Sequence, residues 1–161
     1  MTLYRSTLIA PSRPARLIVA ALTVAVAAVT AQAQTVEWRV VDNPYQEDVA
    51  YTIGDTFNPG VIVDGMRWHS FMVAAPSDLF TEGETVETEV TVVFENRRSK
   101  SAKVLAILLL EDADGNPLDR VQIPPFKVGG DRRKERAETV ELAGSVINAT
   151  ERVYLFFEIL Q

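Results

Sequence analysis

Apolar and polar residues alternate along most of the chain after position 34, and no segment keeps the spacing of an amphipathic helix over three turns. The longest alternating run is 85–96. One of its faces carries only buriable side chains, and the other is mostly acidic; the first face consists of Val86, Thr88, Val90, Val92 and Phe94. Because successive side chains of a strand point to opposite faces, this run predicts a strand with one buried face.

Two further runs predict strands in the interior of a sheet. Residues 103–111 carry apolar side chains at both alternating positions, which predicts a central strand covered on both faces. Residues 152–160 alternate, with Val153, Leu155 and Phe157 expected to point inward. We expect this last run to dock into the sheet.

Turn-forming residues separate the runs. Asp64 and Gly65 lie between two short apolar segments and suit a type I′ hairpin, which needs positive φ at both positions. Similar breaks divide the remainder into strands near 35–41, 48–53, 61–63, 66–74, 85–96, 103–111, 118–123, 136–142 and 152–160. With 61–63 and 66–74 counted as one hairpin, this predicts an all-β, immunoglobulin-like antiparallel β-sandwich of about eight strands. A closed barrel is the alternative.

The first 33 residues have a different character. Their only charges are three arginines, and an uncharged apolar run from Leu17 ends on Ala31-Gln32-Ala33. A positive segment, an apolar segment and an A-x-A site are typical of a secretory leader. We therefore expect a signal peptide at 1–33, cleaved after Ala33, and a single β-sandwich domain at 34–161 that is periplasmic or secreted. An uncleaved membrane anchor is the alternative.

Charge and cysteine usage narrow the range of partners. The formal charge of the whole chain is −6, and removal of the three leader arginines would make it −9. Nucleic acid and anionic membrane surfaces need a basic footprint, so we expect neither as a partner after cleavage. The chain has no cysteine, so a mature domain has no disulfides and depends on its core, for which 47% hydrophobic residues suffice.

The order of features in the second half resembles a known group of domains. An alternating strand ends in Phe94-Glu95-Asn96, a small polar turn Ser99-Lys100-Ser101 follows, and an apolar strand runs from Val104 to Leu110. A turn at 111–116 and a closing strand after Val128-Gly129-Gly130 complete the order. From about Thr85 to Leu160, this resembles small extracellular immunoglobulin-like domains of the FxLYD or CARDB kind. The resemblance implies an accessory or binding module rather than a catalyst.

Catalytic side chains are scarce in this sequence. His69 is the one histidine, and its neighbour Ser70 would point to the opposite face of a regular strand, so the two cannot form a nucleophile and base pair. A zinc site needs three or four ligands of the cysteine, histidine or carboxylate type, and one histidine without any cysteine falls short of this. We expect that the protein is not an enzyme; a carboxylate-dependent hydrolase is the alternative.

Oxygen-bearing side chains gather at one expected hairpin turn: Asp112, Asp114, Asn116 and Asp119. Hard oxygen ligands at this spacing can bind calcium. The spacing differs from that of an EF-hand loop, because Gly115 is fourth rather than sixth and Ile123 takes the place of the closing glutamate. The same residues also favour a turn for backbone reasons. We expect no cofactor, with calcium at these four residues as the alternative.

Aromatic residues cluster between positions 38 and 71. Trp38 is in phase with Val40 and is expected to point inward, whereas Trp68 is the candidate for partial exposure. Aromatic residues of a sandwich mostly belong to its core. The alternative is a carbohydrate-binding site formed by Trp68, Tyr45 and Tyr51.

These observations together predict an exported, non-enzymatic binding or interaction module whose partner is another protein or a second copy of the chain. The apolar strands near the two ends, 36–41 and 153–160, are candidates for self-association by strand addition. A carbohydrate-binding module is the alternative function. The basic run 131–136 is expected to be a mobile, solvated turn, with contact to an anionic partner as its alternative.

Overall fold

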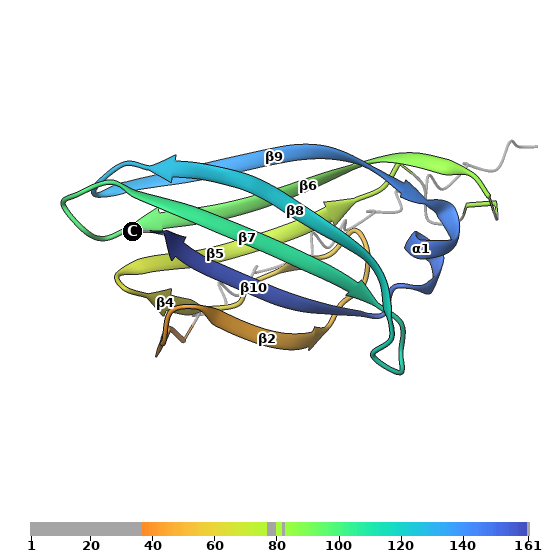
Figure 1. Cartoon of the computed structure of the whole chain (residues 1–161), viewed down its shortest axis with the longest axis horizontal. Helices are drawn as coiled ribbons and strands as arrows, with labels where there is room; N and C mark the ends of the chain where they lie inside the picture. Colours follow the sequence, from red (N-terminus) through yellow and green to blue (C-terminus); the bar gives the residue numbers. More distant parts are fainter. Residues whose placement is uncertain (1–36, 77–79, 82, 161) are drawn as a thin grey trace, which may run out of the picture. The chain divides into compact units, whose positions relative to one another are not determined.

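Two β-sheets face each other in the computed structural model, which describes residues 37–76, 80–81 and 83–160 (Figure 1). The first sheet has the strand order β1-β4-β5-β6-β9, with β3 paired to β5, and the second has the order β2-β10-β7-β8. The elements are β1 (Arg39–Val41), β2 (Tyr45–Ala50), β3 (Thr56–Phe57), β4 (Val61–Val63), β5 (Met66–Ala74), β6 (Thr85–Asn96), β7 (Ala102–Glu111), β8 (Pro117–Val128), β9 (Arg132–Ala143), α1 (Gly144–Ala149) and β10 (Arg152–Leu160).

The core lies between the sheets and contains the side chains that the alternation assigns to it. All five side chains of the apolar face of β6 are buried, and so are Val153, Leu155, Phe157 and Ile159 of β10. Trp68, Phe94 and Phe157 meet at its centre, with ring centroids 5.4 Å apart for Trp68 and Phe94 and 4.8 Å apart for Phe94 and Phe157. The predicted all-β sandwich is confirmed, although β1 pairs with β4 in parallel.

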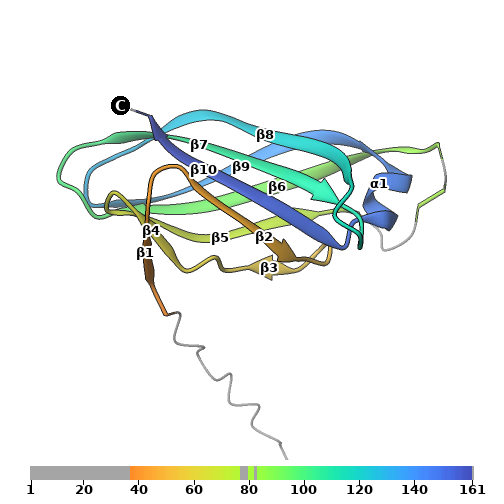
Figure 2. The ribbon, with the colours of Figure 1, turned by 60° about the horizontal axis from the view of Figure 1, so that its bottom comes forward.

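Strand positions within the second sheet are largely as expected. β7 lies between β10 and β8, which confirms the central place predicted for 103–111. β10 pairs along its length with β7 and over six residues with β2, so the last strand docks inside the sheet (Figure 2). The second apolar face of β7 is only half-buried, because no described element covers the outside of this sheet.

The hairpin between β4 and β5 confirms the turn prediction. Val63 pairs directly with Met66, so Asp64 and Gly65 are the two turn residues. Both have positive φ, 45° and 77°, as a type I′ turn requires.

Several segments differ from the sequence prediction. The strand expected at 48–53 is β2 at Tyr45–Ala50, and β3 at Thr56–Phe57 was not expected. β8 continues through Pro124 and Pro125, where a break was expected, because β8 is an edge strand and its pairing with β7 shifts register between Val104 and Ala106. β9 begins at Arg132 and includes most of the basic run that was expected to be a mobile turn. Gly144–Ala149 forms the short helix α1, where only a break was expected.

The expected leader and its cleavage site after Ala33 lie outside the described residues. Within the described part of the chain, no helix has the length and hydropathy needed to cross a membrane.

Candidate functional site

One end of the sandwich is rich in basic side chains, although the chain is acidic overall. Three connections meet there: the β4–β5 turn, the β6–β7 turn at 97–101 and the β8–β9 turn at 129–131, at the left of Figure 1. The basic residues in and next to the last two are Arg97, Arg98, Lys100, Lys103, Lys127, Arg132, Arg133 and Lys134. We call this region the basic end.

Asn96 holds the basic end together from inside. Its side chain is fully buried, and its amide nitrogen donates to the carbonyl oxygens of Lys100 at 2.9 Å and Val128 at 3.2 Å. Its amide oxygen accepts from the backbone N–H of Arg98 at 2.9 Å. One side chain thus links the last residue of β6, the β6–β7 turn and the end of β8.

The β8–β9 turn packs directly on the β6–β7 turn. The backbone N–H of Asp131 donates to the carbonyl oxygen of Arg98 at 2.9 Å. Gly130 lies so close that a Cβ placed on it would be 2.0 Å from the carbonyl oxygen of Ser99. The absence of a side chain at Gly130 is therefore what allows the two turns to touch.

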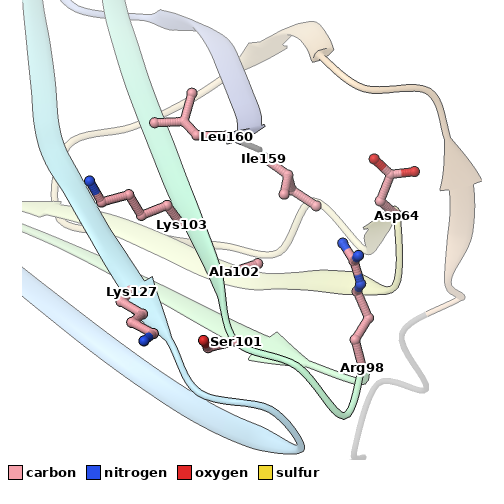
Figure 3. Close-up of a pocket in the computed structure, with 8 residues that line it drawn as sticks. All are labelled: Asp64, Arg98, Ser101, Ala102, Lys103, Lys127, Ile159 and Leu160. Atoms are coloured by element: carbon pink, nitrogen blue, oxygen red, sulfur yellow. The ribbon is translucent and has the colours of Figure 1, made fainter.

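A cavity of about 860 Å³ opens at this end. Its lining residues come from the β4–β5 and β6–β7 turns and from the ends of β7, β8 and β10, and are Asp64, Arg98, Ser101, Ala102, Lys103, Lys127, Ile159 and Leu160 (Figure 3). Arg98 rises from the β6–β7 turn on the side of Asp64, whereas Lys103 and Lys127 come from the neighbouring strands β7 and β8. Three cationic groups and one carboxylate therefore border the same cavity, which we call the basic pocket.

The outer face of the β2-β10-β7-β8 sheet is the second notable surface. Half-buried apolar side chains of β7 and β10 form its middle: Leu105, Ile107, Leu109, Tyr154, Phe156 and Leu160. Strand pairing arranges three complete rows across this face, Asp48-Tyr154-Leu109-Arg120, Gln46-Phe156-Ile107-Gln122 and Ala50-Arg152-Glu111-Pro117. The first two have apolar residues at their centres and polar residues at both edges, whereas the third has the charged pair Arg152 and Glu111 at its centre.

His69 belongs to a polar cluster on the outside of the other sheet. Its Nε2 lies 2.8 Å from Glu95, which also accepts from Arg97 at 2.7 Å and contacts Arg67 at 3.5 Å. The Arg97 hydrogen bond, followed by the His69 contact, lowers the pKa of Glu95 from 4.5 to about 2. Trp38 packs edge-on against the His69 ring, so the expectation that it points inward is wrong.

The candidate carbohydrate-binding aromatics all lie in the core. Exposure is 0% for Trp68 and 5% for both Tyr45 and Tyr51, so none presents a ring face to solvent and the expected exposure of Trp68 is wrong. The reason is a β-bulge: pairing with β6 shifts between Trp68 and Ser70, so the inner row of β5 is Met66, Trp68, Phe71 and Val73 rather than one with Ser70 and Met72.

The buried tyrosines use their hydroxyls within the fold. The Tyr51 hydroxyl donates to the carbonyl oxygen of Asp55 and accepts from the N–H of Val73, both at 2.8 Å. Burial raises the pKa of Tyr51 to about 12. The Tyr45 hydroxyl bonds Glu47, and burial raises its pKa as well. These contacts are structural.

The four residues considered for calcium lie in and beside the β7–β8 turn. The carboxylate of Asp112 accepts from the N–H groups of Asp114 and Asn116 at 2.9 and 2.8 Å and from the Asn116 side-chain amide at 2.9 Å. Asp119 accepts from the N–H of Arg120. The hydrogen bond from Asn116 is the main reason that the pKa of Asp112 is lowered. The turn itself thus uses the carboxylate of Asp112.

The terminal strands are placed differently from what strand addition requires. β10 has a partner on each side, so its edges are unavailable to another chain, and that part of the expectation is wrong. β1 is an edge strand of only three residues. The described edge strands are β1, β9, β2, β8 and the two-residue β3, and β9 carries many charges, which is typical of an edge that avoids pairing.

Sequence reasoning did not single out Arg98, Lys103 and Lys127. The signal that was present is the density of basic residues in 97–103 and 127–134. Recognising that these segments meet requires the pairing of β7 with β8, which the alternation alone does not specify.

The chain matches no protein-family model and no curated protein sequence. Among solved structures it is similar to a DUF1425 family member from Shewanella sp. pv-4, with 13% sequence identity over 71% of this chain and 95% of that chain, at a TM-score of 0.29. A similarity at this level carries no conclusion about function.

Proposed function

We propose that the protein is an exported, non-enzymatic interaction module that pairs with a second copy of itself, packing face to face through the outer face of the β2-β10-β7-β8 sheet. The observation that carries this proposal is the half-buried apolar centre of that face, on its two central strands. Apolar patches of this kind on a folded domain typically mark contact surfaces.

The order of residues in the rows favours a second copy as the occupant. A two-fold axis that runs along the strands between β7 and β10 would set β8 of one copy over β2 of the other. Arg120 would then face Asp48, Tyr154 would face Leu109, and Phe156 would face Ile107. Apolar groups meet apolar groups, and each edge offers opposite charges, so the surface is self-complementary.

Export and a periplasmic or extracellular location are supported by the N-terminal sequence pattern. The immunoglobulin-like resemblance of 85–160 favours a binding rather than a catalytic role.

The test is the mass in solution of the full chain expressed in a bacterium and recovered after processing. Mass spectrometry of the product first shows whether cleavage follows Ala33. Sedimentation equilibrium over a concentration series should then show a monomer–dimer equilibrium. Ile107→Lys, at the centre of the face, should leave a folded monomer, because a buried unpaired charge opposes association.

Two further variants give the controls. Val40→Lys makes the same kind of change on β1, where the side chain is 81% exposed, and should still dimerise. Arg120→Asp should weaken the dimer, because it sets a carboxylate opposite Asp48 of the other copy, and Asp48 keeps its own ion pair with Arg152. A wild-type monomer at every concentration, or an Arg120→Asp dimer as strong as that of wild type, would contradict the proposal.

A further inference from the structure

The basic pocket carries charged side chains that the proposed dimer does not pair, although Leu160 belongs both to the pocket and to the dimer face. Arg98, Lys103 and Lys127 border it, and Asp64 is the one carboxylate in its lining. We propose that this pocket binds a phosphate monoester. The three cations and one carboxylate leave a local charge of about +2, which matches the roughly −1.5 to −2 charge of a phosphate monoester at neutral pH.

The cations of the pocket form no ion pair with the acidic residues of the described chain. Within the described ranges, no ion pair of 4.0 Å or less involves Arg98, Lys103 or Lys127. At the same end Arg97 pairs with Glu95, whereas Lys100, Arg132, Arg133 and Lys134 form no ion pair either in the described part of the chain. The positive charge at the pocket is therefore left for a ligand from solution.

Two of the cations are placed where they disfavour folding. Lys103 and Lys127 are directly opposite each other in the β7–β8 pairing. Like charges at such positions repel and destabilise a sheet. A destabilising pair on the lining of a cavity is typical of groups arranged for binding an opposite charge rather than for stability.

Arg98 is positioned by the fold rather than left free on its turn. Its backbone N–H donates to the side-chain oxygen of Asn96, and its carbonyl oxygen accepts from the backbone N–H of Asp131. Its side-chain stem passes over Gly65, where a Cβ would lie 3.0 Å from the arginine Cγ. A guanidinium held at its base loses less freedom when it forms the two parallel hydrogen bonds that phosphate oxygens accept.

The remaining lining indicates an ester rather than a bare ion. A cavity of about 860 Å³ is far larger than a phosphate group and lies in the range that holds organic ligands. Leu160 and Ala102 supply an apolar wall, Ser101 supplies a hydroxyl, and Ile159 is buried on the opposite face of β10 from Leu160 (Figure 3). We therefore infer that an organic body attached to the phosphate packs on this wall.

The experiment measures binding to the processed full-length product by isothermal titration calorimetry. The probes are glycerol 1-phosphate, inorganic phosphate, and vesicles of phosphatidic acid in phosphatidylcholine, with phosphatidylcholine vesicles as the blank. We expect saturable binding of glycerol 1-phosphate, of the phosphatidic acid vesicles, or of both, and weaker binding of inorganic phosphate. Binding of glycerol 1-phosphate identifies a soluble ester as the source of the phosphate, and binding of the phosphatidic acid vesicles identifies a lipid headgroup.

Variants separate binding at the pocket from general attraction to a basic surface. Lys103→Gln and Lys127→Gln should each weaken binding about tenfold, which is the effect of one charge-assisted hydrogen bond. Each should also raise the melting temperature, because the repulsion between the two lysines is removed. Lys100→Gln removes the same charge from the same end outside the pocket lining and should leave affinity nearly unchanged.

The melting temperature distinguishes a variant that has lost the binding site from one that is misfolded, because a misfolded variant would melt at a lower temperature than wild type, not a higher one. Failure of the dimer test leaves this experiment unaffected, since the pocket lies within one copy. Absence of saturable binding to every probe overturns the proposal. If Lys100→Gln and Lys103→Gln lose equal affinity, the pocket is not the binding site. If inorganic phosphate binds as tightly as glycerol 1-phosphate, the apolar wall plays no part in binding.

Discussion

Glu95 shows how one side chain organises a polar surface cluster. Its carboxylate is 20% exposed and is bonded by Arg97 and His69, with Arg67 near by. Arg67 also lies over the Trp38 ring, 4.7 Å from its centroid, and Trp38 covers His69. The carboxylate thereby holds together two strands, β5 and β6, and the segment that precedes β1.

The pKa of Glu95 makes this role measurable. Because its pKa is about 2 in the fold and 4.5 as its ordinary value, the ionised form stabilises the fold above about pH 4.5. This contribution is lost as the pH falls from 4.5 toward 2. We expect Glu95→Gln to lower the free energy of unfolding at pH 7 by about 1–2 kcal/mol after allowance for screening by solvent. The difference from wild type should shrink toward pH 2.

Urea unfolding from pH 7 to pH 2 is the measurement. Glu87→Gln is the control, because Glu87 is exposed on the same face of the same strand. A constant difference between wild type and Glu95→Gln over the whole pH range would show that the carboxylate charge is not what stabilises the cluster.

The direction in which single side chains point, into the core or toward solvent, was the feature that the sequence predicted least well. Trp38 and Trp68 have exchanged their expected environments, and both errors have local causes. A bulge after Trp68 inverts the alternation of β5, and a sequence pattern of period two contains no mark of the inserted residue. Trp38 precedes β1, and the pattern that should point it inward is not maintained, since Val40 is itself exposed.

At the level of elements, strict alternation predicted strands well. The boundaries 61–63, 66–74, 85–96 and 152–160 are those of β4, β5, β6 and β10. β9 was found only in part, because residues 132–137 are exposed on both faces and have no apolar period to detect. This exposed part of β9 is a strand because its backbone hydrogen-bonds to β6, and the β6–β9 pairing runs along the whole of β6.

The contact between the β6–β7 and β8–β9 turns is the element-scale feature on which the basic end depends. Gly130→Ala places a Cβ against the backbone of Ser99, which cannot move away as a side chain could. We expect a loss of about 1–3 kcal/mol in unfolding free energy, as for other overpacked contacts. Affinity for glycerol 1-phosphate should fall as well, because Arg98 moves with its turn.

The neighbouring glycine provides the control for this variant. A Cβ on Gly129 would meet only the side chain of Arg132, at 3.3 Å, and that side chain can shift. Thermal unfolding and calorimetry of both variants make the comparison. Equal behaviour of Gly129→Ala and Gly130→Ala would show that the two turns do not need their close approach.

Across the whole molecule, charge is segregated between the ends of the sandwich. Basic residues gather at the end with the pocket, whereas acidic residues dominate the end with α1 and the β7–β8 turn (Figure 1): Glu84, Glu111, Asp112, Asp114, Glu141 and Glu151. The net charge of −6 averages over this separation. The net charge therefore determines long-range attraction or repulsion, whereas a local cluster of basic residues can still bind an anion.

The proposed dimer and the proposed pocket should influence each other. A two-fold axis along the strands keeps both basic ends at the same end of the pair, so Lys103 of one copy, on β7 beside the axis, approaches Lys103 of the other. Their mutual repulsion opposes association until bound anions neutralise it. Glycerol 1-phosphate should therefore tighten the dimer about fivefold, and by linkage the dimer should bind it more tightly than the monomer.

Sedimentation equilibrium with and without glycerol 1-phosphate, at constant ionic strength set with sodium chloride, tests this coupling. Constant ionic strength is needed because salt alone screens the lysines. In Lys103→Gln the dimer should be tighter without ligand and should respond less to it, since part of the repulsion is already gone. A dimer that weakens when the anion binds would instead place the basic ends far apart or the ligand in the interface, and would require a different axis for the pair.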